Sequence, residues 1–184
     1  TPGFDTIRKL KLKKVKKNKW PKDSLCIISL KEDTLVKIAG LKKYTLSKEG
    51  NTLCYLTNST IKAKGWKPFS KAKPPRKVNM LYVYTSYPSV FLALEGVTDF
   101  RLSDDGNRLA VLTELTIEKK KSYSIRVYDL RSKNPVREFD QAEKFKLSRW
   151  SESTDKFAFY QSQDTSLENY ELYVYDFKTN KSTI

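Results

Sequence analysis

Histidine is absent from this chain of 184 residues. Because histidine is the commonest general base and the commonest metal ligand, neither a Ser-His-Asp triad nor a Cys-His pair can be built from these residues alone. Cysteine is scarce as well, and Cys26 and Cys54 form no CxxC pair of the kind that binds zinc. The sequence therefore predicts no catalytic residue, no metal and no cofactor in this chain.

Long apolar runs and glycine are also scarce. The longest apolar runs, LCIISL (25–30) and VFLAL (90–94), are far too short to span a bilayer, so no transmembrane segment is predicted. The chain has only 6 glycines but 11 tyrosines, which is typical of strands with aromatic cross-strand pairs rather than of disorder. Cys26 and Cys54 occupy apolar positions of predicted strands, which fits two buried free thiols or a disulfide between neighbouring strands.

A motif recurs at intervals of about 45–55 residues, in LSKEGNTLCYL (46–56), LSDDGNRLAVL (102–112) and WSESTDKFAFY (150–160). Each copy has an apolar residue, a serine, a turn that contains an acidic residue, and then a strand of alternating apolar residues. A second echo, IRVYDL (125–130) and LYVYDF (172–177), follows two of the copies. Repeats of this length indicate a stacked or radial architecture.

The strand and turn patterns between these motifs predict an all-β fold made of consecutive four-stranded antiparallel meanders. One such meander is one blade of a β-propeller, and complete propellers have about four to eight blades. We therefore expect a partial β-propeller of about three blades, with residues 1–184 forming a single propeller-like domain that is a fragment of a longer protein. The predicted blade units are 4–57, 80–117, 123–161 and a partial 170–184, with a basic, proline-containing insertion at 58–79.

Positive charge is concentrated in the first part of the chain. The formal charge is +15, and residues 1–79 contain about 21 Lys and Arg against about 5 Asp and Glu. Two stretches, 7–22 and 61–77, carry most of this charge. The candidate interaction surface predicted from them consists of Lys13, Lys14, Lys16, Lys17, Lys62, Lys64, Lys67, Lys71, Lys73 and Arg76.

This basic surface admits three interpretations. Its lysines could neutralise phosphates while Trp20 and Trp66 stack on bases, or they could meet an anionic membrane or an acidic protein partner. They could also be a solvated edge that serves solubility. Lysine lacks the bidentate fork of arginine, and no RRM, KH, zinc-finger or helix-turn-helix pattern is present, so nucleic acid is the least favoured partner.

Several segments resemble the N-terminal propeller of S9-type serine peptidases, the prolyl oligopeptidase and dipeptidyl-peptidase group, and above all its secreted bacterial members. They are WPKDSLCIISLKEDTLVKIAGLKKYTLSKEGNTLCYL (20–56), VTDFRLSDDGNRLAVLTE (97–114) and SRWSESTDKFAFY (148–160). The last two are similar to the Ser-Pro-Asp-Gly-Lys strand pair of TolB-like and S9 propellers. The chain departs from that pattern at Asp104, which replaces the proline, and in 150–160, which lacks both the proline and the glycine.

The resemblance implies a non-catalytic propeller segment that caps a downstream α/β-hydrolase domain and restricts the access of peptides to it. It also implies an extracytoplasmic protein, periplasmic or secreted. No GxSxG elbow occurs in the sequence, so no catalytic residue of the family can be placed in this chain. The alternative is a TolB- or WD40-like module for protein–protein interaction, with the basic surface as its docking site and no attached enzyme.

Four further residues have a predicted structural role. Trp150 opens a strand of the repeat and is expected in the core. Asp129 and Asp176 follow equivalent Val-Tyr pairs, where an aspartate accepts hydrogen bonds from the backbone of the next turn. Asp105 precedes Gly106 in a predicted β-turn and lacks the spacing of an EF-hand calcium loop.

Overall fold

The computed structural model describes residues 4–16, 20, 23–29, 33–61, 76–85, 91–117, 120–164 and 169–184. In this part of the chain one helix, α1 (Phe4–Leu12), precedes fourteen strands, so the fold is nearly all-β, as predicted. The segment 4–22 fitted either a strand or a helical turn, and its described beginning is helical. No helix among the described residues is long and apolar enough to cross a membrane.

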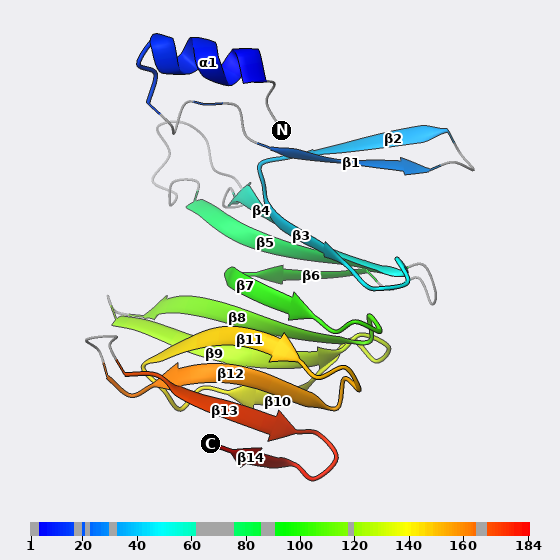
Figure 1. Cartoon of the computed structure of the whole chain (residues 1–184), viewed down its shortest axis with the longest axis vertical. Coiled ribbons are helices and arrows are strands. Elements are labelled where there is room, and N and C mark those ends of the chain that lie inside the picture. Colours follow the sequence, from blue (N-terminus) through cyan, green and yellow to red (C-terminus); the bar gives the residue numbers. More distant parts are fainter. Residues whose placement is uncertain are drawn as a thin grey trace.

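The strands form one two-stranded sheet and three four-stranded sheets, in which all neighbours are antiparallel (Figure 1). The two-stranded sheet is β1 (Ser24–Ser29) with β2 (Thr34–Ala39). Blade 1 consists of β3 (Leu41–Leu46), β4 (Thr52–Ile61), β5 (Arg76–Thr85) and β6 (Phe91–Glu95). Blade 2 consists of β7 (Val97–Leu102), β8 (Arg108–Ile117), β9 (Lys120–Asp129) and β10 (Asn134–Phe139). Blade 3 consists of β11 (Lys144–Trp150), β12 (Lys156–Ser162), β13 (Glu171–Asp176) and β14 (Lys181–Thr183).

The strand pairing corrects the predicted blade boundaries by two strands. The predicted unit 4–57 joined β1–β2 to the first half of blade 1, and the units 80–117 and 123–161 each joined two halves of neighbouring blades. The partial unit 170–184 contains the last two strands of blade 3 rather than the start of a new blade. That residues 1–184 are a single domain of a longer protein stays a prediction.

Single glycines set the boundaries at which blades 1 and 2 begin, whereas the four residues 140–143, none of them glycine, join blade 2 to blade 3. Gly40 alone joins β2 to β3, and Gly96 alone joins β6 to β7, both with positive φ, 74° and 77°. The shortest common hairpin loop has two residues, so a one-residue link cannot return the chain alongside the strand it has just left. The positive φ, which glycine adopts without strain, turns the chain into the next sheet instead.

The predicted insertion 58–79 is also shorter than expected. Residues 58–61 continue β4 and residues 76–79 begin β5, and the two strands pair out to Ile61 and Arg76. The prolines that suggested a loop, Pro68, Pro74 and Pro75, lie outside the described residues, as does the whole of 62–75. Proline removes a backbone N–H donor and was therefore expected to end the strands early, but the pairing of β4 with β5 continues up to Arg76.

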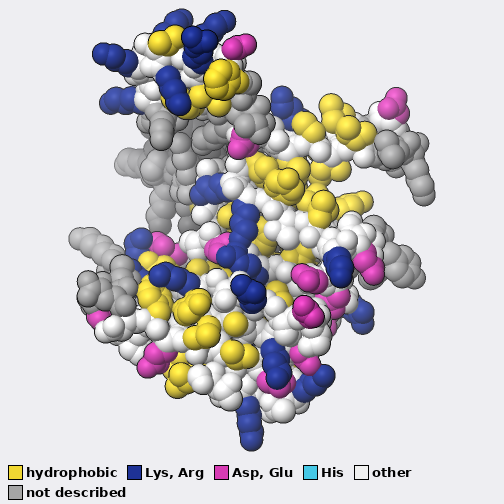
Figure 2. All heavy atoms as spheres, viewed as in Figure 1, with side chains coloured by type: hydrophobic (Ala, Val, Ile, Leu, Met, Phe, Trp, Pro, Cys, Tyr) yellow, Lys and Arg dark blue, Asp and Glu magenta, His cyan; other side chains and the backbone are white. Residues whose placement is uncertain are grey.

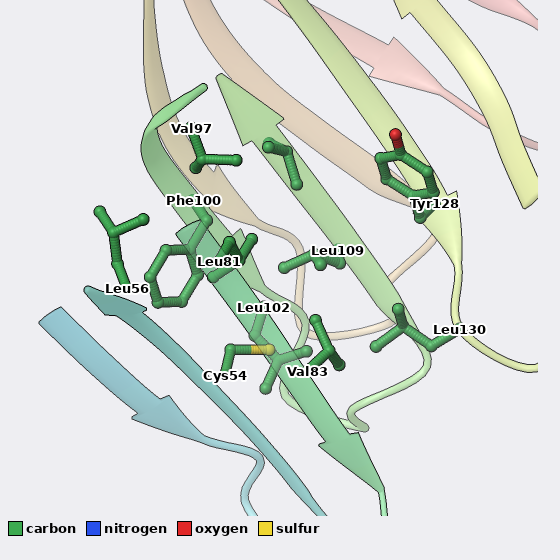
Figure 3. Close-up of a cluster of buried hydrophobic side chains, with 11 residues drawn as sticks. Cys54, Leu56, Leu81, Val83, Val97, Phe100, Leu102, Leu109, Tyr128 and Leu130 are labelled. Atoms are coloured by element: carbon green, nitrogen blue, oxygen red, sulfur yellow. The ribbon is translucent and has the colours of Figure 1, made fainter. Parts of the chain in front are cut away.

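Two hydrophobic clusters hold the blades together, and each lies between two consecutive blades. Figure 3 shows the first, in which Cys54, Leu56, Leu81 and Val83 of blade 1 meet the buried side chains of blade 2. The second cluster joins the opposite face of blade 2 to blade 3 and is rich in aromatic rings. Its fully or nearly buried members are Ala110, Leu112, Ile125, Val127, Phe145, Leu147, Trp150, Phe157, Phe159 and Tyr175.

The serine of the repeated motif closes the same turn in all three blades. Ser47, Ser103 and Ser151 each accept, on the side-chain Oγ, a hydrogen bond of 2.9–3.0 Å from the backbone N–H five residues later. Each serine also pairs its own backbone N–H with the carbonyl of that same residue. These two hydrogen bonds close the turn between the first two strands of each blade, which explains why serine recurs at this position.

The glycine missing from the third copy of the motif is replaced by a strained threonine. Gly50 and Gly106 have φ of 73°, and Thr154 stands at the same place in its turn with φ of 57°. A non-glycine residue in this region of φ is uncommon. The Oγ1 of Thr154 donates to Asp105 in blade 2 (3.2 Å), so a contact between blades offsets part of the strain.

The two cysteines are both free, and only one of them is buried. Cys54 belongs to the cluster between blades 1 and 2, as the buried-thiol interpretation required. Cys26 lies exposed on β1, which corrects the prediction that both are buried. The reason is that β1–β2 has only two strands, and the face that carries Cys26 and Lys37 is not covered.

We expect the two thiols to react at very different rates. Burial raises the pKa of Cys54 to about 12, so its thiolate is scarce at pH 8 and its sulfur is shielded from solvent. An aromatic disulfide reagent should therefore release about one equivalent of chromophore rapidly from the native chain and the second only after unfolding in urea. Cys26→Ser should remove the rapid phase alone, and two equal rates in the wild type would contradict this assignment.

Candidate functional site

The predicted basic surface is only partly described. Lys13, Lys14 and Lys16 directly follow α1, and Figure 2 shows Lys and Arg side chains gathered over this helix. The side chain of Arg76 is not among the described ones. Lys17, Lys62, Lys64, Lys67, Lys71 and Lys73 lie outside the described residues. The basic surface therefore stays a prediction.

The aromatic residue next to the first basic stretch has a structural contact. The Nε1 of Trp20 donates a hydrogen bond of 2.8 Å to the carbonyl oxygen of Val15. Trp20 is half-buried, so its ring is partly covered. Trp66, the other ring proposed to stack on bases, lies outside the described residues.

The first strands of the three blades are linked by an ion cluster. Lys43 of β3 contacts Asp99 of β7, with 2.5 Å between Nζ and Oδ1, and also donates to the carbonyl of Phe100. Arg101 of β7 holds the same carboxylate with Nη1 and donates from Nε to the carbonyl of Ser148 in β11 (2.9 Å). The cluster thus ties blade 1 to blade 2 and blade 2 to blade 3. Because its members satisfy one another, it acts as a structural clamp.

A polar cleft of about 610 Å³ opens between blades 1 and 2 at the edge opposite the repeated turns. Two carboxylates line it, from Glu95 at the end of β6 and Glu114 on β8, together with Asn79 and Thr98. The Oε1 of Glu114 is 2.7 Å from Nζ of Lys121, and this hydrogen bond raises the pKa of Lys121. The lining residues of the cleft carry hydrogen-bond acceptors, which suit the binding of polar groups, although Glu114 is already paired with Lys121.

The repeated turns form a second, acidic edge that connects the blades. Partial burial raises the pKa of Asp105, but hydrogen bonds from Ser103, Asn107 and Thr154 outweigh it, and the pKa ends below its ordinary value. A hydrogen bond from Lys178, with others from Ser153 and Ser151, likewise lowers the pKa of Asp155. Both aspartates are therefore charged at neutral pH and occupied by local donors.

Hydrogen bonds confirm the structural roles predicted for Trp150, Asp129 and Asp176. Trp150 is buried in the second cluster, and its Nε1 donates to the carbonyl of Arg101 (3.1 Å). Asp129 accepts from the backbone N–H groups of the next turn at 2.8 and 3.2 Å. Asp176 does the same at 2.8 and 3.2 Å.

The described residues provide few of the side chains that metal binding or nucleophilic catalysis requires. Their Cys, Asp and Glu side chains form no group of three or more that could hold a metal ion. The polar cleft contains carboxylates and hydroxyls, but the absence of histidine from the sequence leaves no imidazole to activate Thr98 as a nucleophile. The sequence did not predict the ion cluster or the cleft, because both arise from residues far apart in the chain.

Comparison with known proteins identifies the fold. No protein-family profile and no curated protein matches the chain. Solved structures do match, among them the β-propeller domain of the Trilobed protease from Pyrococcus furiosus, at 17% identity and a TM-score of 0.55, over 79% of this chain and 42% of that one. The acylaminoacyl peptidase of Pyrococcus horikoshii matches at 10% identity and a TM-score of 0.56, over 88% of this chain and 27% of that one. TolB from Acinetobacter baumannii has a lower TM-score, 0.48, at 12% identity, over 89% of this chain and 38% of that one.

The chain is thus a partial β-propeller, as predicted, and spans less than half the length of these solved chains. Two of the similar structures are peptidases or their propellers, which agrees with the fold that the resemblance implied. At identities of 10–17% the likeness concerns the fold alone.

Proposed function

We propose that this chain is the non-catalytic propeller segment of an S9-type serine peptidase. In that role it would cap an α/β-hydrolase domain of the same parent chain and restrict the peptides that reach the catalytic centre. The hydrolase would lie downstream, and the parent protein would be extracytoplasmic, either periplasmic or secreted. The substrate would be a peptide that the propeller admits by size.

One observation carries the proposal: three consecutive four-stranded blades, stacked in chain order, have a fold that matches the β-propeller domain of one protease and part of a second peptidase, at TM-scores of 0.55 and 0.56. The motifs in 97–114 and 148–160 point to the same family. Their serines and acidic residues close the turns and link the blades, so the residues that carry the resemblance also support the architecture.

The charge distribution is compatible with a scaffold. In the described part of the chain, Lys43, Asp99 and Arg101 are engaged with one another across blades, and Asp105 and Asp155 are engaged in turns. Without histidine the chain cannot supply the base of a serine triad, so the nucleophile and its base would belong to the attached domain.

The experiment is to identify the native protein in its source with an antibody raised against this chain. We expect a band several times larger than 21.4 kDa that also reacts covalently with a fluorophosphonate probe for serine hydrolases. The isolated chain serves as the control and should remain unlabelled. A native band near 21.4 kDa, or a large band that the probe never labels, would refute the attachment to a serine peptidase.

The capping role needs a second readout on the same parent protein. If the propeller restricts access, short peptides should be hydrolysed well and a large unfolded protein poorly. Equal rates per cleavable bond for both substrates would exclude a size filter, but they would not contradict the attachment of the chain to a hydrolase domain.

A further inference from the structure

The strand pairing places corresponding residues of the three blades in register. The pair Leu46–Leu53 of blade 1 corresponds to Leu102–Leu109 in blade 2 and to Trp150–Phe157 in blade 3. Counting outward along the strands from this pair gives further corresponding positions, each with one residue from every blade. Three of these sets lie on the same face of their blades, here called the leading face. These sets are Leu46, Leu102 and Trp150; Tyr44, Phe100 and Leu147; and Tyr84, Tyr128 and Tyr175.

The leading faces of blades 2 and 3 are buried, whereas that of blade 1 is exposed. In blades 2 and 3 each of these six side chains is at most 9% exposed, because the preceding blade covers them. In blade 1 the side chains of Tyr44, Leu46 and Tyr84 are 53–55% exposed. Tyr55 and Tyr82 lie on the same face with their rings stacked at 5.2 Å. The leading face of blade 1 therefore has the composition of an interface between blades.

The opposite, trailing face of each blade shows the reverse pattern. In blade 1 it consists of Cys54, Leu56, Leu81 and Val83, which are at most 3% exposed beneath blade 2. The matching residues of blade 3 are Ala158, Tyr160, Leu172 and Val174. Tyr160 and Leu172 are 37% and 43% exposed. One chain thus presents both halves of an interface that it already forms twice within itself.

The neighbouring hairpin leaves the leading face of blade 1 open. Figure 2 shows hydrophobic side chains over the β1–β2 hairpin and, next to it, over blade 1. Ile28, Leu35 and Val36 of the hairpin are themselves exposed. Exposed apolar side chains that gather in one patch are typical of an interaction site.

We propose that copies of this chain associate head to tail, with the trailing face of blade 3 in one copy packed on the leading face of blade 1 in the next. The observed register of the two internal interfaces defines the fit, with Ala158 and Val174 in the places that Cys54 and Val83 take against blade 2. Such a contact joins two different surfaces, so it extends into a ring or a chain of copies. The proposal concerns the isolated chain and does not depend on an attached hydrolase.

The test is sedimentation equilibrium of the 184-residue chain and two variants, Tyr84→Glu on the leading face and Leu172→Glu on the trailing face. The average mass of the wild type should rise with concentration above the monomer mass of 21.4 kDa. Each variant alone should stay monomeric, because a charge in an apolar interface is costly. An equimolar mixture should form a dimer and nothing larger, because each variant retains one of the two complementary faces.

Val136→Glu provides the matched control, since Val136 is half exposed on β10 and belongs to neither face. It should associate like the wild type. Tyr44→Glu provides a second leading-face variant and should behave like Tyr84→Glu. Far-ultraviolet circular dichroism confirms that each variant is folded. A monomeric wild type would overturn the proposal, as would a Leu172→Glu variant that still self-associates or a mixture of the two variants that stays monomeric.

Discussion

Replacing Phe157 by alanine is expected to lower the free energy of unfolding by about 3–5 kcal/mol, the range for deletion of a large buried aromatic ring. The ring is fully buried between blades 2 and 3 and packs against Trp150 at 4.7 Å and Phe159 at 6.1 Å between centroids. Neighbouring rings cannot collapse into the gap without losing their own contacts, so a cavity should remain. Urea denaturation followed by tryptophan fluorescence measures the loss.

Leu115→Ala is the control for this prediction, because Leu115 is half exposed on β8. A surface substitution of this kind changes stability by about 0.5 kcal/mol or less. The total stability of a domain is about 5–15 kcal/mol, so Phe157→Ala removes a large part of it. A loss below about 1 kcal/mol at Phe157 would mean that the packing between blades 2 and 3 is not what stabilises the chain.

Gly106→Ala should destabilise the chain by about 3 kcal/mol, as the sum of a backbone and a packing penalty. With φ of 73°, any side chain at Gly106 is strained. A Cβ there would also lie 2.7 Å from Oγ1 of Thr52 and 2.9 Å from Cβ of Ser47, both in blade 1. The substitution would therefore push blades 1 and 2 apart at a point where Thr52 donates to the carbonyl of Gly106.

Gly50 offers a closely matched comparison, because its φ is also 73° but nothing lies within 4 Å of a Cβ placed there. Gly50→Ala should incur only the backbone penalty of about 1–2 kcal/mol. The difference between the two variants in urea denaturation then isolates the contact between blades. Equal losses at the two glycines would show that the turn of blade 2 does not press on blade 1 in solution.

The sequence was sufficient for the period of the fold, because the period depends on local chemistry. Each copy of the motif contains a serine that closes its own turn and a strand whose alternation is visible in the residues themselves. Asp129 and Asp176 were predictable for the same reason, since their hydrogen bonds reach only two or three residues along the chain. The family resemblance rests on these local motifs as well.

The phase of the repeat was not predictable in the same way. A repeat of four strands has the same length whichever strand is taken as the first strand of a blade. The predicted units started two strands too early and therefore combined halves of neighbouring blades. Gly40 and Gly96 mark the beginnings of blades 1 and 2, and a lone glycine between two strands is the signal that would have revealed these two boundaries. Its meaning becomes clear only once it is known which strands pair.

Sequence alone determined the all-β architecture, the closed turns and the exclusion of a histidine-dependent site, because these follow from residue types and from contacts between near neighbours. Tertiary structure alone decided which residues from distant segments meet. Cys54 is buried while Cys26 is exposed, Thr154 of blade 3 reaches Asp105 of blade 2, and Lys43 joins Asp99 across two blades. The exposure of Tyr84, whose counterparts Tyr128 and Tyr175 are buried, has the same origin: burial depends on which blade lies in front, and no local pattern records that.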